Sequence, residues 1–302
     1  MSQHHPQTPP PHLQLSRRAF LAGTAGLALA AACGSDDDTS ATSTTTGDTE
    51  YALGVFFDQN RFVHTGGEQR LPFGLFAGGL PAAFDQAPDQ IEVTLANDAE
   101  TGGGQSIVVP RHGQGMPRPY FPVTTTFDRP GTWSARSEID GNPIEATFVV
   151  NEPDQVSFLK VGEATPEIET PTIDDAHGVN PICTNTPPCP LHDVTLAAAL
   201  DENSPIAFLV ASPAFCVTSV CGPVLDVLLA ASEGHDGIHF LHAEVYVDPT
   251  VRQREPTPAM TEMGLTHEPV LYLIGADGLL VDRLDFVFDI AEVTAALGRL
   301  ST

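Results

Sequence analysis

Two cysteines in the second half of the chain are the residues best suited to chemistry. Cys216 and Cys221 lie in SPAFCVTSVCGPV, with four residues between them, after an apolar run and before a Gly-Pro pair. Thiols at this spacing could form a reversible disulfide, a structural bridge or part of a metal site. In a regular α-helix, residues five apart lie about 8–9 Å from each other between Cα atoms, whereas a disulfide needs less than about 7 Å. The pair can therefore bridge only if one cysteine precedes the helix or the first turn is open.

The roles of the two thiols follow from where the helix begins. A cysteine at a helix N-terminus is reactive, because the helix dipole stabilises its thiolate. We predict that Cys216 is the exposed, attacking thiol and that Cys221 is the resolving one. The reverse assignment stays open, because Pro223 can begin a helix and would make Cys221 the nucleophile at its cap.

A second pair of cysteines lies in the proline-rich segment PICTNTPPCPLHDV. A short loop closes easily, and its prolines restrain it further. We predict a structural disulfide between Cys183 and Cys189. A second redox couple, or a metal site that includes His192, is the alternative.

The elements that position these residues alternate between strands and helices. PIAFLVAS is a buried-strand run, GPVLDVLLAASEG has a helical apolar period, and IHFLHAEVYVD is a further strand. EPVLYLIGADGLLVDRLDFV indicates two strands about an Ala-Asp-Gly turn, and DIAEVTAALGRL a closing amphipathic helix. This order predicts an α/β domain with one open sheet over residues 156–302.

The order of elements, with two cysteines just after the first core strand, resembles the thioredoxin superfold. FLKVGEATPEIETPT is similar to the N-terminal segment of membrane-tethered thioredoxin-like proteins and peroxiredoxins. Glu268-Pro269 matches the position of the cis-proline that begins a strand in thioredoxins. The resemblance implies a thioredoxin-like α/β fold and thiol–disulfide oxidoreductase activity through Cys216 and Cys221, with Pro269 beside the active thiols. The implied partner is a thiol or disulfide of another envelope protein, and no cofactor is required.

Two further families compete with this interpretation. SPAFCVTSVCG resembles the cysteine phrase of Q-type peroxiredoxins with one inserted residue, but Ser212 is displaced and THEPVLYLI lacks the arginine of that family. The Sco copper proteins have two cysteines and a histidine ahead of a similar strand, which implies a Cu(I) site at Cys216, Cys221 and His267 as the alternative function. A last alternative is a non-catalytic envelope binding module with a permanently closed disulfide.

The segment 51–151 has a different pattern. IEVTLAN, QSIVVP, YFPVTTTF and IEATFVV are short runs rich in β-branched and aromatic residues, separated by Gly, Pro and Asp clusters. We predict an all-β, immunoglobulin-like sandwich that contains the only tryptophan, Trp133, and a hairpin turn at Asp140-Gly141. His64, Arg111 and His112 show no ligand spacing and are expected at the surface.

The N-terminal residues 1–33 have the pattern of an export signal. LSRRAFLAGTAGLALAAAC joins Arg17 and Arg18 to an apolar stretch that ends in small residues and Cys33. It resembles a bacterial twin-arginine signal fused to a lipobox. The resemblance implies export, diacylglyceryl modification of Cys33 and a lipid anchor on the extracytoplasmic face of the cell membrane. Residues 34–50 are rich in Ser, Thr and Asp and are expected to be a disordered tether.

The charge of the chain excludes one class of partner. Asp and Glu number 39 against 13 Lys and Arg, which gives a formal net charge of −26. Such a surface repels phosphate backbones, so we expect no nucleic acid partner. The hydrophobic content of 41% is sufficient for a packed core.

Overall fold

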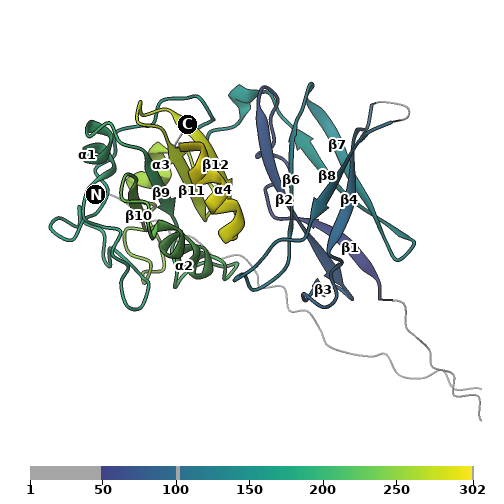
Figure 1. Ribbon diagram of the computed structural model, residues 1–302, viewed down its shortest axis with the longest axis horizontal. Helices are drawn as coiled ribbons and strands as arrows, with labels where there is room; N and C mark the ends of the chain where they lie inside the picture. Colours follow the sequence, from purple (N-terminus) through teal and green to yellow (C-terminus); the bar gives the residue numbers. More distant parts are fainter. Residues whose placement is uncertain (1–48, 100–102, 301–302) are drawn as a thin grey trace, which may run out of the picture. The chain divides into compact units, whose positions relative to one another are not determined.

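The computed structural model describes residues 49–99 and 103–300. In this part of the chain, twelve strands form three four-stranded sheets, accompanied by a few short helices, so the fold is rich in β-structure (Figure 1). The segments expected as domains, 51–151 and 156–302, belong to one compact unit, Asp48–Thr302. The predicted export and lipidation residues Arg17, Arg18 and Cys33 lie outside the described residues. None of the described helices is both long and apolar enough to cross a membrane.

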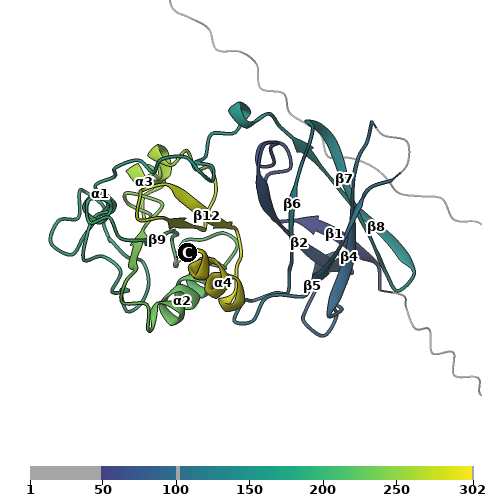
Figure 2. The same cartoon turned by 45° about the horizontal axis from the view of Figure 1, so that its top comes forward.

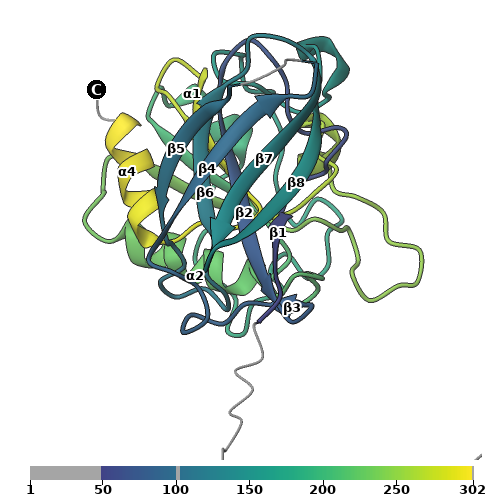
Figure 3. The same cartoon turned by 90° about the vertical axis from the view of Figure 1, so that its right-hand side faces the viewer.

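Two antiparallel sheets contain the first eight strands. The β4–β7–β8 strands run side by side in Figure 3, flanked by β5. One sheet consists of β1 (Tyr51–Val55), β2 (Glu68–Ala77), β3 (Leu80–Pro81) and β6 (Phe121–Thr126). The other consists of β4 (Gln90–Asn97), β5 (Gln105–Pro110), β7 (Gly131–Ile139) and β8 (Asn142–Val150).

Alternation of side chains decides which face of each strand is buried. In β4, Ile91, Val93 and Leu95 are buried, while the intervening residues point to the other face. Asp140 and Gly141 both have positive φ, at 52° and 80°, in the tight turn between β7 and β8. This is the backbone of the hairpin turn that Asp-Gly favours, and the turn predicted there is confirmed.

The two sheets, drawn as ribbons in Figure 2, are joined by aromatic side chains. The ring of Phe57 contacts Phe73 of β2 and Phe148 of β8, at centroid distances of 5.8 and 5.7 Å. Trp133 is partly buried and packs edge-on against Phe127 at 5.0 Å. The two sheets therefore share an apolar core, in which the tryptophan lies at the margin.

The third sheet carries the cysteines. Its strand order is β10–β9–β11–β12, with β10 parallel to β9 and the other pairs antiparallel. All residues of β9 and β11 are buried, as their continuous apolar runs predict. The strands are β9 (Ile206–Val210), β10 (His239–Ala243), β11 (Val270–Ile274) and β12 (Leu280–Asp285).

Helices connect and cover this sheet. Helix α2 (Cys221–Ser232) links β9 to β10, and α4 (Ile290–Leu300) follows β12 and contacts α2. Both helices were predicted. Three short helical segments were not predicted, because a single turn carries too few residues to show a period: η1 (Pro153–Gln155), α1 (Leu196–Asp201) and α3 (Pro258–Glu262).

Polar contacts join β2 to α4 within the same compact unit. Arg70 forms a bidentate ion pair with Glu292, with N–O distances of 2.6 and 2.8 Å. Tyr120 donates to the same carboxylate at 2.5 Å. Two histidines expected at the surface lie elsewhere: His64 is buried, and His112 places Nδ1 3.1 Å from an oxygen of Asp289. These positions could not be predicted from residue spacing, because they depend on contacts between segments that are far apart in the sequence.

Candidate functional site

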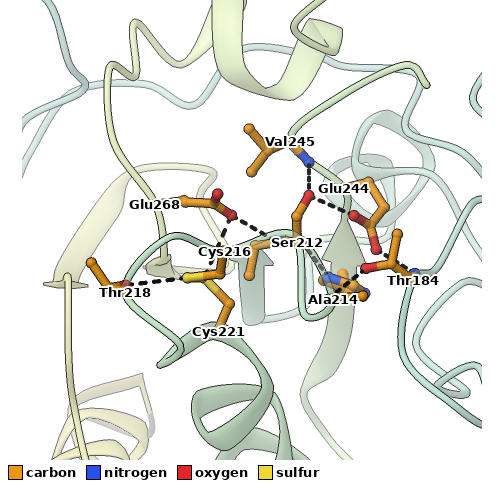
Figure 4. Close-up of a disulfide and its surroundings, with 11 residues drawn as sticks. Thr184, Ser212, Ala214, Cys216, Thr218, Cys221, Glu244, Val245 and Glu268 are labelled. Atoms are coloured by element: carbon orange, nitrogen blue, oxygen red, sulfur yellow. Dashed lines mark hydrogen bonds between the residues drawn. A yellow bond between two sulfur atoms is a disulfide. The ribbon is translucent and has the colours of Figure 1, made fainter. Parts of the chain in front are cut away.

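Cys216 and Cys221 form a disulfide at the end of β9 (Figure 4). Their Cα atoms are 5.9 Å apart. Cys221 is the first residue of α2, and Cys216 lies in the loop before it. Of the two conditions under which the pair could bridge, the structure meets the first, because Cys216 precedes the helix.

The two sulfurs differ in exposure. Cys221 is fully buried, whereas Cys216 is partly exposed. The loop around Cys216 is exposed: Val217 is 94% exposed, and Thr218 and Ser219 are exposed as well. The Thr218 hydroxyl lies 3.2 Å from the Cys216 sulfur. Cys216 is therefore the more exposed of the two sulfurs, as predicted, and its role as the attacking thiol stays a prediction.

Glu268 is the residue of this site that the sequence analysis missed. Its Oε2 lies 3.5 Å from the Cys221 sulfur and accepts a 2.7 Å hydrogen bond from the backbone N–H of Ser212. Burial raises the pKa of Glu268 to about 7. The available signal was its place next to Pro269, which the resemblance had already put beside the thiols.

Pro269 is buried at the start of β11, and its peptide bond with Glu268 is cis, as predicted. Its carbonyl oxygen accepts a 2.9 Å hydrogen bond from the N–H of Phe286. This bond joins the start of β11 to the residue that follows β12.

The placement of His267 corrects the copper alternative. Its Nε2 lies 2.8 Å from Asp285 Oδ1, and its ring stacks on Phe286 at a centroid distance of 4.2 Å. Among the described residues, the group of potential ligands at the disulfide is Cys216, Cys221 and Glu268, without His267. The imidazole is bound to a buried carboxylate instead, so the predicted trio of two thiolates and one imidazole does not form.

The carboxyl group of Asp285 is ionised because its neighbours stabilise the negative charge. Although burial alone would raise the pKa of Asp285, the charge of Arg283 and the hydrogen bond with His267 hold it well below its usual range. Arg283 contacts both oxygens of Asp285 and donates a 2.8 Å hydrogen bond to the carbonyl of Leu159. His267 therefore belongs to a buried ion-pair network.

Cys183 and Cys189 also differ from the prediction. Both are free thiols, with sulfurs 3.6 Å apart, so the structural disulfide expected between them is not formed. They lie in a buried group with His192 and His242. Hydrogen bonds from the Cys189 thiol and from both imidazoles lower the pKa of Cys183 in spite of burial. The sequence analysis named His192 as an alternative partner and missed His242, which lies about 50 residues further along the chain.

A chain of hydrogen bonds connects the two cysteine sites (Figure 4). The hydroxyl of Ser212 donates to Glu244 Oε2 at 2.6 Å. The other oxygen of Glu244 accepts a 2.5 Å hydrogen bond from the backbone N–H of Thr184, the neighbour of Cys183. Desolvation raises the pKa of Glu244, which is completely buried. The loop before α2 is therefore held in place by the segment that carries the second pair of cysteines.

No family model matches the chain, and none of the curated proteins compared with it matches its sequence. What the site does is therefore inferred from its residues. A disulfide with one accessible sulfur, next to a carboxyl group that titrates near neutral pH, has the parts needed for thiol–disulfide exchange.

Proposed function

We propose that this protein is a thioredoxin-like thiol–disulfide oxidoreductase, in which Cys216 and Cys221 exchange electrons with a dithiol or disulfide of another envelope protein. One observation carries the proposal: the disulfide is asymmetric. Cys216 is accessible before the helix, and Cys221 is buried at its first residue beside Glu268.

The topology of the third sheet supports the thioredoxin-like assignment. The parallel pair β9–β10 is connected through α2, and the antiparallel hairpin β11–β12 completes an order of β10–β9–β11–β12. The disulfide follows the central strand β9 and begins α2. The two sheets of the first half, which share an aromatic core, are compatible with an immunoglobulin-like sandwich.

The proposed exchange proceeds in two displacements. A partner thiolate attacks the sulfur of Cys216, the Cys216–Cys221 bond breaks, and Cys221 leaves with the electron pair. The protonated carboxyl group of Glu268 donates its proton to this leaving thiolate. A second partner thiolate then attacks the partner sulfur of the mixed disulfide and releases Cys216 as a thiolate, which takes up a proton from solvent. The partner dithiol is oxidised to a disulfide, the protein disulfide is reduced to two thiols, and the reverse sequence runs by the same path.

The N-terminal pattern supports the proposed location. The twin arginines Arg17 and Arg18, the apolar stretch and Cys33 occur in the order of an exported lipoprotein signal. A lipid at Cys33 would hold the protein at the membrane surface without a spanning segment. An oxidising compartment is also where disulfides persist.

A redox titration of the full chain tests the proposal. The chain is equilibrated in dithiol buffers of graded potential, quenched with acid, alkylated, and the peptide containing Cys216 and Cys221 is weighed by mass spectrometry. We expect a midpoint above about −300 mV, in the range of exchange catalysts rather than of structural disulfides. A midpoint far below that value would make the bond structural and would refute the proposal.

A trapping experiment assigns the roles of the two thiols. The Cys221→Ser variant should accumulate a mixed disulfide through Cys216, because no resolving thiol remains. The Cys216→Ser variant is the matched control, and its remaining thiol is buried. Equal accumulation in both variants would contradict the assignment of Cys216 as the attacking residue.

A further inference from the structure

A second cluster of chemically competent side chains lies outside the disulfide. Cys183, Cys189, His192 and His242 each offer one ligand atom, all four atoms lie within 4.8 Å of one another, and all four residues are buried. We propose that these residues form a tetrahedral, fully protein-ligated zinc site. The evidence for this site does not rest on the proposed exchange at Cys216 and Cys221.

The separations between the ligand atoms match a tetrahedron around zinc. Bonds of about 2.3 Å to sulfur and about 2.05 Å to nitrogen, at tetrahedral angles, require about 3.8 Å between the sulfurs, about 3.3 Å between the nitrogens and about 3.6 Å for each mixed pair. The sulfurs are 3.6 Å apart and the nitrogens His192 Nε2 and His242 Nδ1 are 3.3 Å apart. Three of the four mixed pairs measure 3.3, 3.4 and 3.9 Å. These distances leave room for one ion at the centre and are too long for a bond between the sulfurs.

The second nitrogen of His242 fixes the tautomer that a metal needs. Its Nε2 lies 2.9 Å from the carbonyl oxygen of Ala211, which can only accept a hydrogen bond. The proton is therefore on Nε2, and the lone pair of Nδ1 points at the two sulfurs. A metal-bound histidine is oriented in this way by a carbonyl behind it.

The fold brings the ligands together from distant parts of the chain. His242 is on β10, and its backbone N–H donates to the carbonyl of Leu191 at 3.0 Å. This bond places the segment with Cys189 and His192 beside the strand. The backbone N–H of Cys189 donates to the Cys183 sulfur at 3.3 Å, a contact that favours a thiolate there.

The charge of the cluster favours zinc over Cu(I). Two thiolates and two neutral imidazoles balance Zn²⁺ to a net charge of zero, whereas Cu(I) would leave one negative charge in a buried site. Glu244 is completely buried nearby and bonds to the backbone next to Cys183, so an additional negative charge would be repelled. A closed set of two sulfurs and two nitrogens with no open position is typical of structural zinc.

The position of the site indicates what the ion stabilises. It would join the loop of residues 183–192 to β10, and through Thr184 and Glu244 it supports Ser212 at the base of the disulfide loop. Because a structural zinc contributes directly to folding, its removal should loosen this part of the molecule first.

Metal analysis of the full chain tests the proposal. The chain is produced in zinc-supplemented medium, purified in mild detergent and desalted, and its zinc is measured by plasma mass spectrometry. We expect one zinc per chain, lost in the Cys189→Ser and His192→Ala variants. Two matched controls should keep it: the double variant Cys216→Ser/Cys221→Ser, which removes the other two thiols, and His239→Ala, which removes a neighbouring histidine of β10.

Cobalt substitution covers the case in which a ligand variant does not fold. In the otherwise unchanged Cys216→Ser/Cys221→Ser chain, bound Co²⁺ should show the intense visible bands of a tetrahedral complex together with thiolate-to-cobalt charge transfer. Zinc should also protect Cys183 and Cys189 from alkylation until a chelator is added. A Cys183–Cys189 disulfide in the purified chain, a zinc-free chain, retention of zinc by both ligand variants, or binding of Cu(I) but not zinc would each overturn the proposal.

Discussion

Replacing Glu268 by Gln gives the sharpest test of how the disulfide works. Reduction of the disulfide places a developing negative charge on Cys221, 3.5 Å from Glu268 Oε2. Two full negative charges at this separation repel each other by about 5 kcal/mol at an effective dielectric constant of about 20. If the leaving sulfur carries about half a charge in the transition state, an ionised Glu268 raises the barrier by about 2 kcal/mol, or roughly 30-fold in rate.

The effect depends on pH because burial raises the pKa of Glu268 to about 7. About 1% of Glu268 is ionised at pH 5 and about 90% at pH 8. The protonated form does not repel the leaving thiolate and donates a proton to it, so Glu268→Gln gains nothing at pH 5. The ratio of the rates, variant over wild type, should rise from one or below at pH 5 to about 8 at pH 8, where about 10% of Glu268 is still protonated and reacts at the full rate. It should approach roughly 30 only at higher pH, and the inverse ratio, wild type over variant, should fall with a midpoint near 7.

Quenched-flow reduction measures this ratio. The full chain is mixed with excess dithiothreitol, quenched and alkylated, and the reduced fraction of the Cys216–Cys221 peptide is followed with time. The ratio cancels the pH dependence of the attacking reagent, which acts equally on both proteins. Glu262→Gln, at an exposed glutamate of α3, is the matched control and should give a ratio of one at every pH. A flat ratio for Glu268→Gln, or a midpoint near 4.5, would refute the role assigned to Glu268.

The same shifted pKa predicts a pH-dependent stability. Because burial raises the folded pKa of Glu268 to about 7, above its ordinary value of 4.5, the stabilisation from the protonated form is complete below the unfolded pKa and is lost as pH rises through 7. The shift corresponds to about 3 kcal/mol. Compared with Glu268→Gln, the wild-type chain should therefore lose unfolding free energy between pH 5 and pH 8, as measured by denaturant titration.

Three further predictions concern other parts of the chain. Asp285→Asn leaves Arg283 buried without its anion and should lower the unfolding free energy by about 3–5 kcal/mol, whereas Asp226→Asn, at an exposed position, should be near neutral. Because the pKa of Asp285 is lowered, its contribution to stability is present above about pH 4 and is lost as pH falls. Equal effects of the two variants at pH 7 would contradict the ion-pair assignment. Cys33→Ser should abolish labelling by a fatty acid and release the chain from membranes, and continued labelling would exclude the lipoprotein prediction. His267→Ala should lower stability and leave the rate of thiol exchange and the metal content unchanged, and a loss of bound metal would restore His267 as a ligand.

The elements of the third sheet could be predicted because local patterns determine them. The apolar runs of β9 and β11 are long enough to indicate buried strands, and the apolar period of 221–232 indicates a helix. Helical geometry also allowed Cys216 and Cys221 to bridge only if one of them precedes the helix or the first turn is open, and Cys216 does precede α2. In these cases the residues that determine each strand or helix lie within the element itself, so a local pattern is enough to predict it.

The partners of His267 and of the second cysteine pair could not be predicted, because they come from distant segments. His267 bonds to Asp285, and His242 reaches His192 across about 50 residues of sequence. Its spacing to the nearest strand suggested that His267 faces the thiols. In the structure its imidazole instead binds the carboxylate of Asp285, which also pairs with Arg283. A histidine beside a buried carboxylate is held by that carboxylate, whatever motif surrounds it in the chain.

The two cysteine pairs show why neighbours, and not spacing, decide the chemistry of a thiol. Cys183 and Cys189 have five residues between them, Cys216 and Cys221 have four, and either spacing allows a short bridge. The first pair is enclosed with the imidazoles of His192 and His242, and two ionised thiolates in this group would be best balanced by a divalent cation. The second pair has a carboxyl group as its neighbour, which would repel a thiolate when ionised and supply a proton when neutral. We therefore propose a bound cation at the first pair and, at the second, a disulfide that opens and closes with proton transfer.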